Sequence, residues 1–219
     1  MIGPFIIPDS TLAALTRAPS DRPTLLLLRH SARGPLPPGE PGNNIRLLPE
    51  GEALARQLGS HLAGRLVSLH TSPVARCVET AEALADGAGI QASIVEDTHL
   101  GDPGVYVLDP DAAWQTWTTL GHERVMAHLV AGERLEGLAD PAAASRRLIQ
   151  HMRARAEGRP GVHVFITHDS LLTAAAAHAL RQPIRKEDWP WYLEALALVD
   201  EGERLQATYR TWSGAVEWG

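Results

Sequence analysis

Residues 25–34 read "LLLLRHSARG", a run of four leucines followed directly by Arg29, His30 and, three residues later, Arg33. A short continuous apolar run is typical of a strand that is buried on both faces, as in the parallel sheets of α/β proteins. Ligands of such open sheets bind just beyond the carboxyl ends of the strands. We therefore expect a buried first strand that ends in a cationic binding loop.

Further apolar runs alternate with amphipathic segments along the rest of the chain. In the amphipathic segments apolar residues recur every three or four positions, as in helices with one buried face. Alternation of strands and helices predicts a largely parallel sheet in an α/β fold. The expected strands are 24–28, 65–70, 91–96 and 161–167, and the expected helices between them are 49–64 and 72–87.

The helix expected at 72–87 carries signals at both of its ends. Ser72 is placed to be its N-cap, Pro73 its first residue and Gly87 the residue just past its end. The tail, residues 192–212, reads as two strands joined by a turn at "DEGE", so we expect an antiparallel pair that closes the sheet.

Two stretches depart from the alternation. Residues 34–44, "GPLPPGEPGNN", are rich in proline and glycine and predict a loop next to the arginine and histidine cluster. Residues 101–158 contain helical patterns, and we expect a cap-like insertion there, between the third and fourth core strands. Apart from this insertion, the chain is predicted to form a single domain over residues 1–219.

Composition and charge limit the possible partners. The chain has 219 residues, of which 44% are hydrophobic and 21% charged, and its formal net charge is −6. These proportions are ordinary for a globular protein, and the negative charge disfavours general attraction to nucleic acid or to an anionic membrane. We expect neither as a partner, and the sequence gives no indication of the oligomeric state.

The cellular compartment is inferred from the cysteine content and from the N-terminus. Cys77 is the only cysteine, so the chain cannot form an intramolecular disulfide. The start "MIGPFIIPDS" has no basic region, and its apolar run is broken by two prolines, unlike a signal peptide. Because no apolar stretch approaches the length of about 20 residues that crosses a bilayer, we expect a cytoplasmic protein.

Cationic side chains gather where expected strands end. Arg29, His30 and Arg33 follow the first strand, Arg76 lies near the start of the helix after the second, and His168 follows "VFIT". Parallel strands bring these junctions to one edge of the sheet. Guanidinium groups pair bidentately with phosphate oxygens, so three arginines with two histidines predict a site for a phosphoryl group.

A histidine among arginines is also suited to nucleophilic catalysis. Cationic neighbours lower its pKa and favour the neutral imidazole, whose free nitrogen can attack phosphorus. His30 is then the candidate nucleophile, and His168 binds the phosphoryl oxygens from the opposite side. The leaving alkoxide needs a proton, for which Asp169, next to His168, is the first candidate.

These motifs resemble those of the histidine phosphatase superfamily, the phosphoglycerate mutase-like and histidine acid phosphatase group. The resemblance rests on "LRHSARG", "HTSPVARCVETAEAL" and "FITHDSLL", in this order, and covers most of residues 24–180. It implies a three-layer α/β/α sandwich with a mainly parallel sheet. It also implies a phosphohistidine that forms transiently on the first histidine. The residues that match the family's site are His30 as the phosphorylated histidine, with Arg29, Arg33, Arg76 and His168 as the phosphate pocket.

The resemblance leaves two candidates for the proton donor. Members similar to the acid phosphatases carry an aspartate directly after the second histidine, which matches Asp169. Members similar to phosphoglycerate mutase use a glutamate after the third strand, where this chain has Asp102 within "HLGDPGVYV". Asp169 is favoured because its neighbour His168 fixes its position near the site.

The expected activity is hydrolysis of small-molecule phosphomonoesters. Two alternatives stay open, a phosphoglycerate mutase-like phosphotransferase and a non-catalytic module that binds phosphorylated ligands. No metal or other cofactor is expected, because His30 and His168 lack carboxylate or cysteine partners at ligand spacing. The chain also has no glycine-rich motif that holds a nucleotide.

Overall fold

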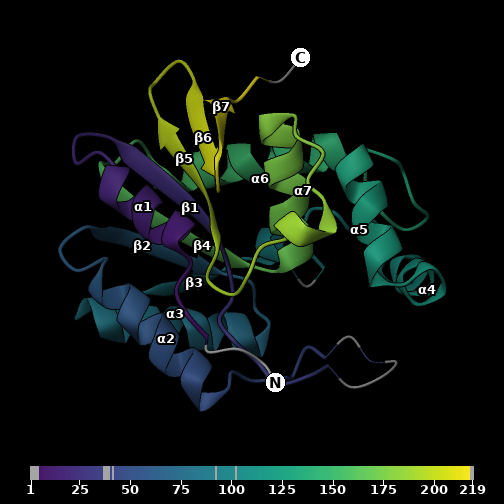
Figure 1. The fold of residues 1–219 in the computed structure, drawn as a ribbon, viewed down its shortest axis with the longest axis horizontal. Helices are drawn as coiled ribbons and strands as arrows, with labels where there is room; N and C mark the ends of the chain where they lie inside the picture. The colour runs from purple at the N-terminus through teal and green to yellow at the C-terminus, as the bar shows by residue number, and fades with distance from the viewer. Residues whose placement is uncertain (1–4, 37–39, 41, 92, 102, 218–219) are drawn as a thin grey trace.

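The computed structural model describes residues 5–36, 40, 42–91, 93–101 and 103–217. The strands form one sheet in the order β3-β2-β4-β1-β5-β6-β7, with helices on both faces (Figure 1). The strands are β1 Pro23–Arg29, β2 Leu66–Thr71, β3 Ile94–Glu96, β4 Gly161–Thr167, β5 Ala195–Asp200, β6 Leu205–Tyr209 and β7 Trp212–Ala215. The helices are α1 Asp9–Arg17, α2 Pro49–Ser60, α3 Ala75–Ala88, α4 Pro110–Leu120, α5 His122–Ala131, α6 Pro141–Ala156 and α7 Asp169–Leu180.

The leucine run of β1 lies at the centre of the molecule because both of its faces are covered. Leu26 and Leu28 pack into the core under α1, α2 and α3, whereas Leu25 and Leu27 pack into the core under α6 and α7. All four side chains are at most 2% exposed. Burial of each contributes about 1.5–3 kcal/mol, so alternation between two cores explains why the strand is apolar at every position.

The strand pairing confirms the predicted α/β fold with a parallel core. β1 and β2 both pair with β4 in parallel, and β3 pairs with β2 in parallel. β5 then pairs antiparallel with β1, and β6 pairs antiparallel with β5, as expected for the tail. A third antiparallel strand, β7, follows at the sheet edge. The carboxyl ends of the parallel strands therefore meet at one edge, next to the antiparallel half of the sheet.

The start and end of α3 differ from the prediction. The helix begins at Ala75 with Val74 as its N-cap, because the N–H of Ser72 still pairs with the Ile166 carbonyl of β4. Gly87 lies inside the helix, where α3 packs so closely on α2 that a Cβ would overlap the Arg56 carbonyl. The helix ends instead at Ala88, and its C-cap is Gly89, which has a left-handed φ of 67°.

The segment expected as a cap divides into two parts. Figure 1 shows α4 and α5 beyond α7, away from the sheet. The third helix, α6, instead packs beside α7, and its Leu148, Ile149 and Met152 enter the core under the sheet. We therefore propose a cap over residues 103–140 rather than 101–158, within a single domain. Among the helices that the structure describes, none has the length and apolarity needed to span a membrane.

Candidate active site

The register between β1 and β4 brings the two predicted histidines together. Arg29 pairs with Thr167 across the two strands, and the N–H of His30 donates to the Thr167 carbonyl at 2.9 Å. His30 and His168 therefore leave neighbouring strand ends at the same level. Their ring centroids are 5.6 Å apart with an interplanar angle of 66°.

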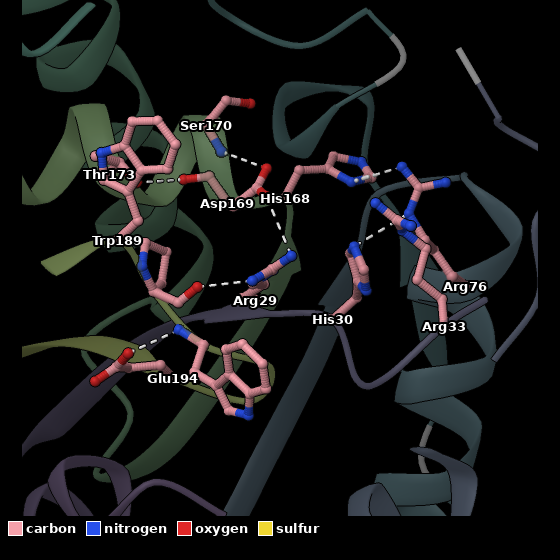
Figure 2. A network of polar contacts seen from close by, with 12 residues as sticks. Arg29, His30, Arg33, Arg76, His168, Asp169, Ser170, Thr173, Trp189 and Glu194 are labelled. Atoms are coloured by element: carbon pink, nitrogen blue, oxygen red, sulfur yellow. Dashed lines mark hydrogen bonds and ion pairs between the residues drawn. The ribbon is translucent and has the colours of Figure 1, made fainter. Parts of the chain in front are cut away.

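Arg76 in the first turn of α3 connects the two rings (Figure 2). Its Nε lies 3.1 Å from Nε2 of His30, and its Nη2 lies 3.2 Å from Nδ1 of His168. Its Nη1 donates to the Gly42 carbonyl at 2.8 Å. The side chain is buried, so this position is fixed by the start of α3 and by the loop around residue 42.

These contacts define the tautomer of each histidine. Because a guanidinium only donates, the nitrogens that face Arg76 carry lone pairs. The proton of His30 is then on Nδ1, which donates to the Ser31 carbonyl at 2.8 Å. The proton of His168 is on Nε2, which donates to the Ser72 hydroxyl at 3.1 Å. Nε2 of His30 is thus free to act as a nucleophile once Arg76 has another partner.

Burial and charge keep both rings neutral. The pKa of His30 is lowered well below its usual range by burial, and further by His168, Arg29 and Arg76. Burial and the charge of Arg76 also lower the pKa of His168, to about 3. At neutral pH neither ring carries a positive charge, so the positive charge next to them comes from the arginines.

Arg29 lies in a different environment from the other arginines. Its Nη2 lies 3.1 Å from Oδ2 of Asp169, and its Nη1 donates to the Pro190 carbonyl at 2.7 Å. The guanidinium carbon also lies 4.4 Å from the centroid of the Tyr192 ring, a cation–π contact. Figure 2 shows Arg29 reaching toward Asp169, whereas Arg76 lies against the histidines. The guanidinium of Arg29 is therefore already engaged without substrate.

Asp169 is held as a carboxylate by this arrangement. Burial opposes its ionisation, but the charge of Arg29, with smaller contributions from His122 and His168, outweighs burial and lowers its pKa. Its Oδ1 also accepts the N–H of Ser170 at 2.9 Å. The other candidate donor, Asp102, lies outside the described residues.

Arg33 belongs to the same pocket as His30, Arg76 and His168. It forms an isolated bridge with Leu47, and its Nη1 donates to the neighbouring Gly34 carbonyl at 2.7 Å. Its Nε is buried with no hydrogen-bond partner among the described residues. The structure therefore gathers His30, Arg33, Arg76, His168 and Asp169 around one pocket.

The sequence did not indicate two residues that position His168. Ser72, predicted as an N-cap, instead contacts Nε2 of His168 through its hydroxyl. Gly101 has a φ of 143°, and a Cβ there would lie 2.8 Å from Nε2 of His168 and 2.9 Å from the Ser72 hydroxyl. The glycine after the third strand was a possible signal, because glycine permits close backbone approach to a neighbouring group.

Cys77 lies next to the site but is not suited to nucleophilic attack. Its sulfur is 3.8 Å from Nε2 of His168, and the residue is fully buried. Burial raises the pKa of the thiol to about 12. Because the thiolate is the reactive form of cysteine, His30 is the better nucleophile of this pocket.

One side-chain cluster in the described part of the chain has the spacing of metal ligands, and it lies apart from the pocket. Asp97 accepts from Nδ1 of His99 at 2.9 Å and from Nε2 of His151 at 2.5 Å. The two imidazole rings stack with centroids 3.8 Å apart and an interplanar angle of 10°. Near-parallel rings direct their nitrogens side by side rather than toward one point, so the arrangement fits a carboxylate shared by two histidines.

Comparisons with known proteins agree with this fold. The model of the histidine phosphatase superfamily (branch 1) matches residues 25–200. No curated protein sequence matches the chain significantly. The chain belongs to the histidine phosphatase superfamily, and this membership supports its assignment as an enzyme that hydrolyses phosphate esters.

Several solved structures share the fold at low sequence identity. A phosphoserine phosphatase mutant from Entamoeba histolytica, in complex with phosphoserine, has a TM-score of 0.61 and 14% identity, covering 86% of this chain and 97% of that one. YhfR of Bacillus stearothermophilus has a TM-score of 0.58 and 21% identity, and the match covers 89% of this chain and 100% of that one. A phosphoglycerate mutase from Bacillus anthracis has a TM-score of 0.57 and 14% identity, and the match covers 87% of this chain and 93% of that one.

Proposed function

We propose that the protein hydrolyses phosphomonoesters of small molecules through a phosphohistidine on Nε2 of His30. The contact between Nε of Arg76 and Nε2 of His30, at 3.1 Å, carries the proposal. It supports a neutral imidazole whose lone pair faces a cation inside the pocket. A phosphoryl group that entered there would meet its nucleophile and a charge-neutralising guanidinium together.

The proposed reaction has two steps. In the first step Nε2 of His30 forms a bond to phosphorus while the bond between phosphorus and the ester oxygen breaks. The leaving alkoxide takes a proton from a carboxylic acid, for which Asp102 and Asp169 are the candidates. In the second step water attacks phosphorus and gives a proton to the carboxylate left by the first step, the bond to Nε2 breaks, and inorganic phosphate leaves.

Arg33 and Arg76 are the proposed ligands of the phosphoryl oxygens, together with Arg29 and His168. Planar guanidinium groups support this role because they can bind two oxygens at once. His168 is proposed to donate its Nε2–H, which meets the Ser72 hydroxyl without substrate, to the same oxygens when substrate is bound. Removal of Arg76 from Nε2 of His30 by the incoming phosphoryl group would expose the lone pair when substrate is bound.

We further propose that the substrates are small phosphorylated molecules of the cytoplasm. The single cysteine, Cys77, is buried and unpaired, which supports a reducing compartment. The formal net charge of −6 supports small anions captured by local arginines rather than nucleic acid or anionic membranes.

The test is to trap the phosphorylated enzyme. Incubation with a phosphomonoester labelled in its phosphate should place alkali-stable, acid-labile label on the wild-type chain. His30→Gln, which nearly preserves side-chain volume at this buried position, should abolish both the label and turnover. His61→Ala at an exposed histidine is the matched control. Turnover by a folded His30→Gln variant within about tenfold of the wild type would reject His30 as the nucleophile.

A further inference from the structure

The pocket at the strand ends is much larger than a phosphoryl group. Its volume is about 630 Å³, and His30, Arg33, Arg76 and His168 line it together with a set of mainly apolar residues. Pockets of 300–1,000 Å³ are typical for whole small molecules. The part of the pocket beyond the phosphate-binding residues therefore has room for the alcohol portion of the substrate.

One face of α4 forms a wall of this part. Pro110, Ala113, Trp114 and Trp117 all line the pocket, and their spacing of three, one and three residues places them on one side of a helix. Trp114 is 37% exposed although its side chain is large and apolar. Amphipathic helices usually bury such a face in the core, whereas α4 directs it to the pocket.

Other elements add further apolar residues to the lining. Leu129 and Leu138 come from the proposed cap, and Leu171 comes from α7. Tyr106 adds an aromatic ring, and its hydroxyl is already paired with the Ser145 hydroxyl at 2.7 Å. The phenol is therefore not available as a polar contact, and only its carbon surface can face a ligand.

The same part of the pocket has no lysine or arginine among its described residues to bind a second anionic group, and His122, beside Trp117, is the one histidine that lines it away from His30 and His168. Among the described lining residues, the only arginines are Arg33 and Arg76, both at the phosphate end, and there is no lysine. Glu40 also lines the pocket and would repel a substrate carboxylate. Residues 37–39, 41 and 102, outside the described part of the chain, are proline, glycine and aspartate in the sequence and so include no lysine or arginine.

We propose that this pocket selects the monophosphate of an uncharged alcohol with an apolar, ring-sized carbon skeleton, which packs against the Trp114 face of α4. The inference rests on the proposed function and adds its substrate class. An apolar skeleton gains from contact with the tryptophan face. A phosphorylated hydroxy acid places its carboxylate among apolar and acidic groups, where an unpaired charge is disfavoured.

The first experiment compares phosphate esters of primary alcohols. Their leaving groups have similar basicity, so differences in kcat/KM report on binding of the alcohol portion. The probes are 3-phenylpropyl phosphate, glycerol 3-phosphate, O-phosphoserine and 3-phosphoglycerate. We expect kcat/KM for 3-phenylpropyl phosphate to exceed the value for glycerol 3-phosphate about tenfold or more, with the two carboxylated esters lower still.

The second experiment changes the apolar wall. Trp114→Ala should lower kcat/KM for 3-phenylpropyl phosphate about tenfold more than kcat/KM for glycerol 3-phosphate. Gln115→Ala, at the exposed neighbouring position of α4, is the control and should change neither value. Trp114→Arg should reduce the preference for the apolar ester over O-phosphoserine, because it adds a cation to the pocket.

The outcomes separate the two proposals. Equal or better hydrolysis of the carboxylated esters would leave the proposed function standing and overturn the apolar specificity. If no ester is hydrolysed, the proposed function fails, and calorimetric binding of the intact esters to His30→Gln decides the specificity. Tighter binding of 3-phenylpropyl phosphate than of O-phosphoserine supports the inference, and the reverse order overturns it.

Discussion

Arg29 and Asp169 form an ion pair, with 3.1 Å between Nη2 of the arginine and Oδ2 of the aspartate. A general acid must hold its proton when the substrate arrives. Although burial opposes ionisation of Asp169, the charge of Arg29 lowers its pKa overall, so the group is a carboxylate at neutral pH. The ion pair therefore supports a positioning role for Asp169, and we propose Asp102 as the proton donor instead.

The dependence on the leaving group tests this proposal. An alkyl alkoxide needs a proton to leave, whereas p-nitrophenolate does not. Asp102→Asn should therefore slow hydrolysis of an alkyl phosphate about 100-fold more than hydrolysis of p-nitrophenyl phosphate. Asp169→Asn should slow both to a similar extent, because it releases Arg29. Steady-state kinetics of both variants on both esters give the answer. If Asp169→Asn alone shows the leaving-group dependence, Asp169 is the donor.

Substitution of Arg76 by lysine should be severe although the charge is kept. The guanidinium contacts His30 through Nε and His168 through Nη2, and a single ammonium cannot reach both positions. We expect kcat to fall about 100-fold with little change in the folded structure. Arg204→Lys, at an arginine that is 64% exposed, is the matched control. Similar kinetics for the two variants would contradict the assignment of Arg76 to the site.

Ser72→Ala should impair activity more than stability. The hydroxyl contacts Nε2 of His168 at 3.1 Å and makes a long contact, 3.4 Å, to the N–H of Val74. Loss of one such hydrogen bond lowers the free energy of unfolding by about 1 kcal/mol. A His168 ring that is no longer held in place should lower kcat about tenfold. Ser72→Thr keeps the hydroxyl and should restore activity. If both variants lose activity equally, the hydroxyl does not position His168.

His70 should make the protein less stable in acid. Its ring stacks on Phe165 with centroids 4.7 Å apart, and both of its nitrogens are buried with no partner among the described residues. Burial lowers its pKa from the usual 6.5 to about 4, although Asp97 raises it somewhat. The charged groups that oppose protonation are Arg155, His151 and His163.

The sign of the pH effect follows from this lowered pKa. Between pH 6.5 and about 4 the unfolded chain binds a proton at this position more readily than the folded one. Stability therefore falls across this window as the pH falls, by up to about 3 kcal/mol. His70→Phe should abolish this contribution. The free energy of unfolding in urea should therefore exceed that of the wild type by more at pH 5 than at pH 8. An equal gain at both values would contradict the prediction.

The strands and the two histidines could be predicted because local signals define them. The leucine run of β1 needs two covered faces, and the chain places His30 and His168 directly after buried strands. The start of α3 could not be predicted in the same way. Ser72 and Pro73 indicate that a helix begins nearby, but the pairing of Ser72 with Ile166, which lies in a distant strand, delays it to Ala75.

The other features of the site that could not be predicted depend on contacts between segments far apart in the sequence. The pairing of Arg29 with Asp169 joins residues at the ends of two strands, and nothing near either residue specifies the other. Trp114 and Trp117 lie on one face of α4. Helical spacing shows that α4 has an apolar face, but not that this face borders a pocket.

The central position of β4 also determines when the site can exist during folding. β4 lies between β1 and β2, yet it follows both of them in the chain. Until residues 161–167 have been synthesised and inserted, the first two strands have no common partner, and His30 has no second histidine opposite it. Such long-range pairing forms late and slowly. If the pocket binds phosphate as proposed, that binding reports completion of the central sheet, and we expect a nascent chain that ends before β4 to be inactive.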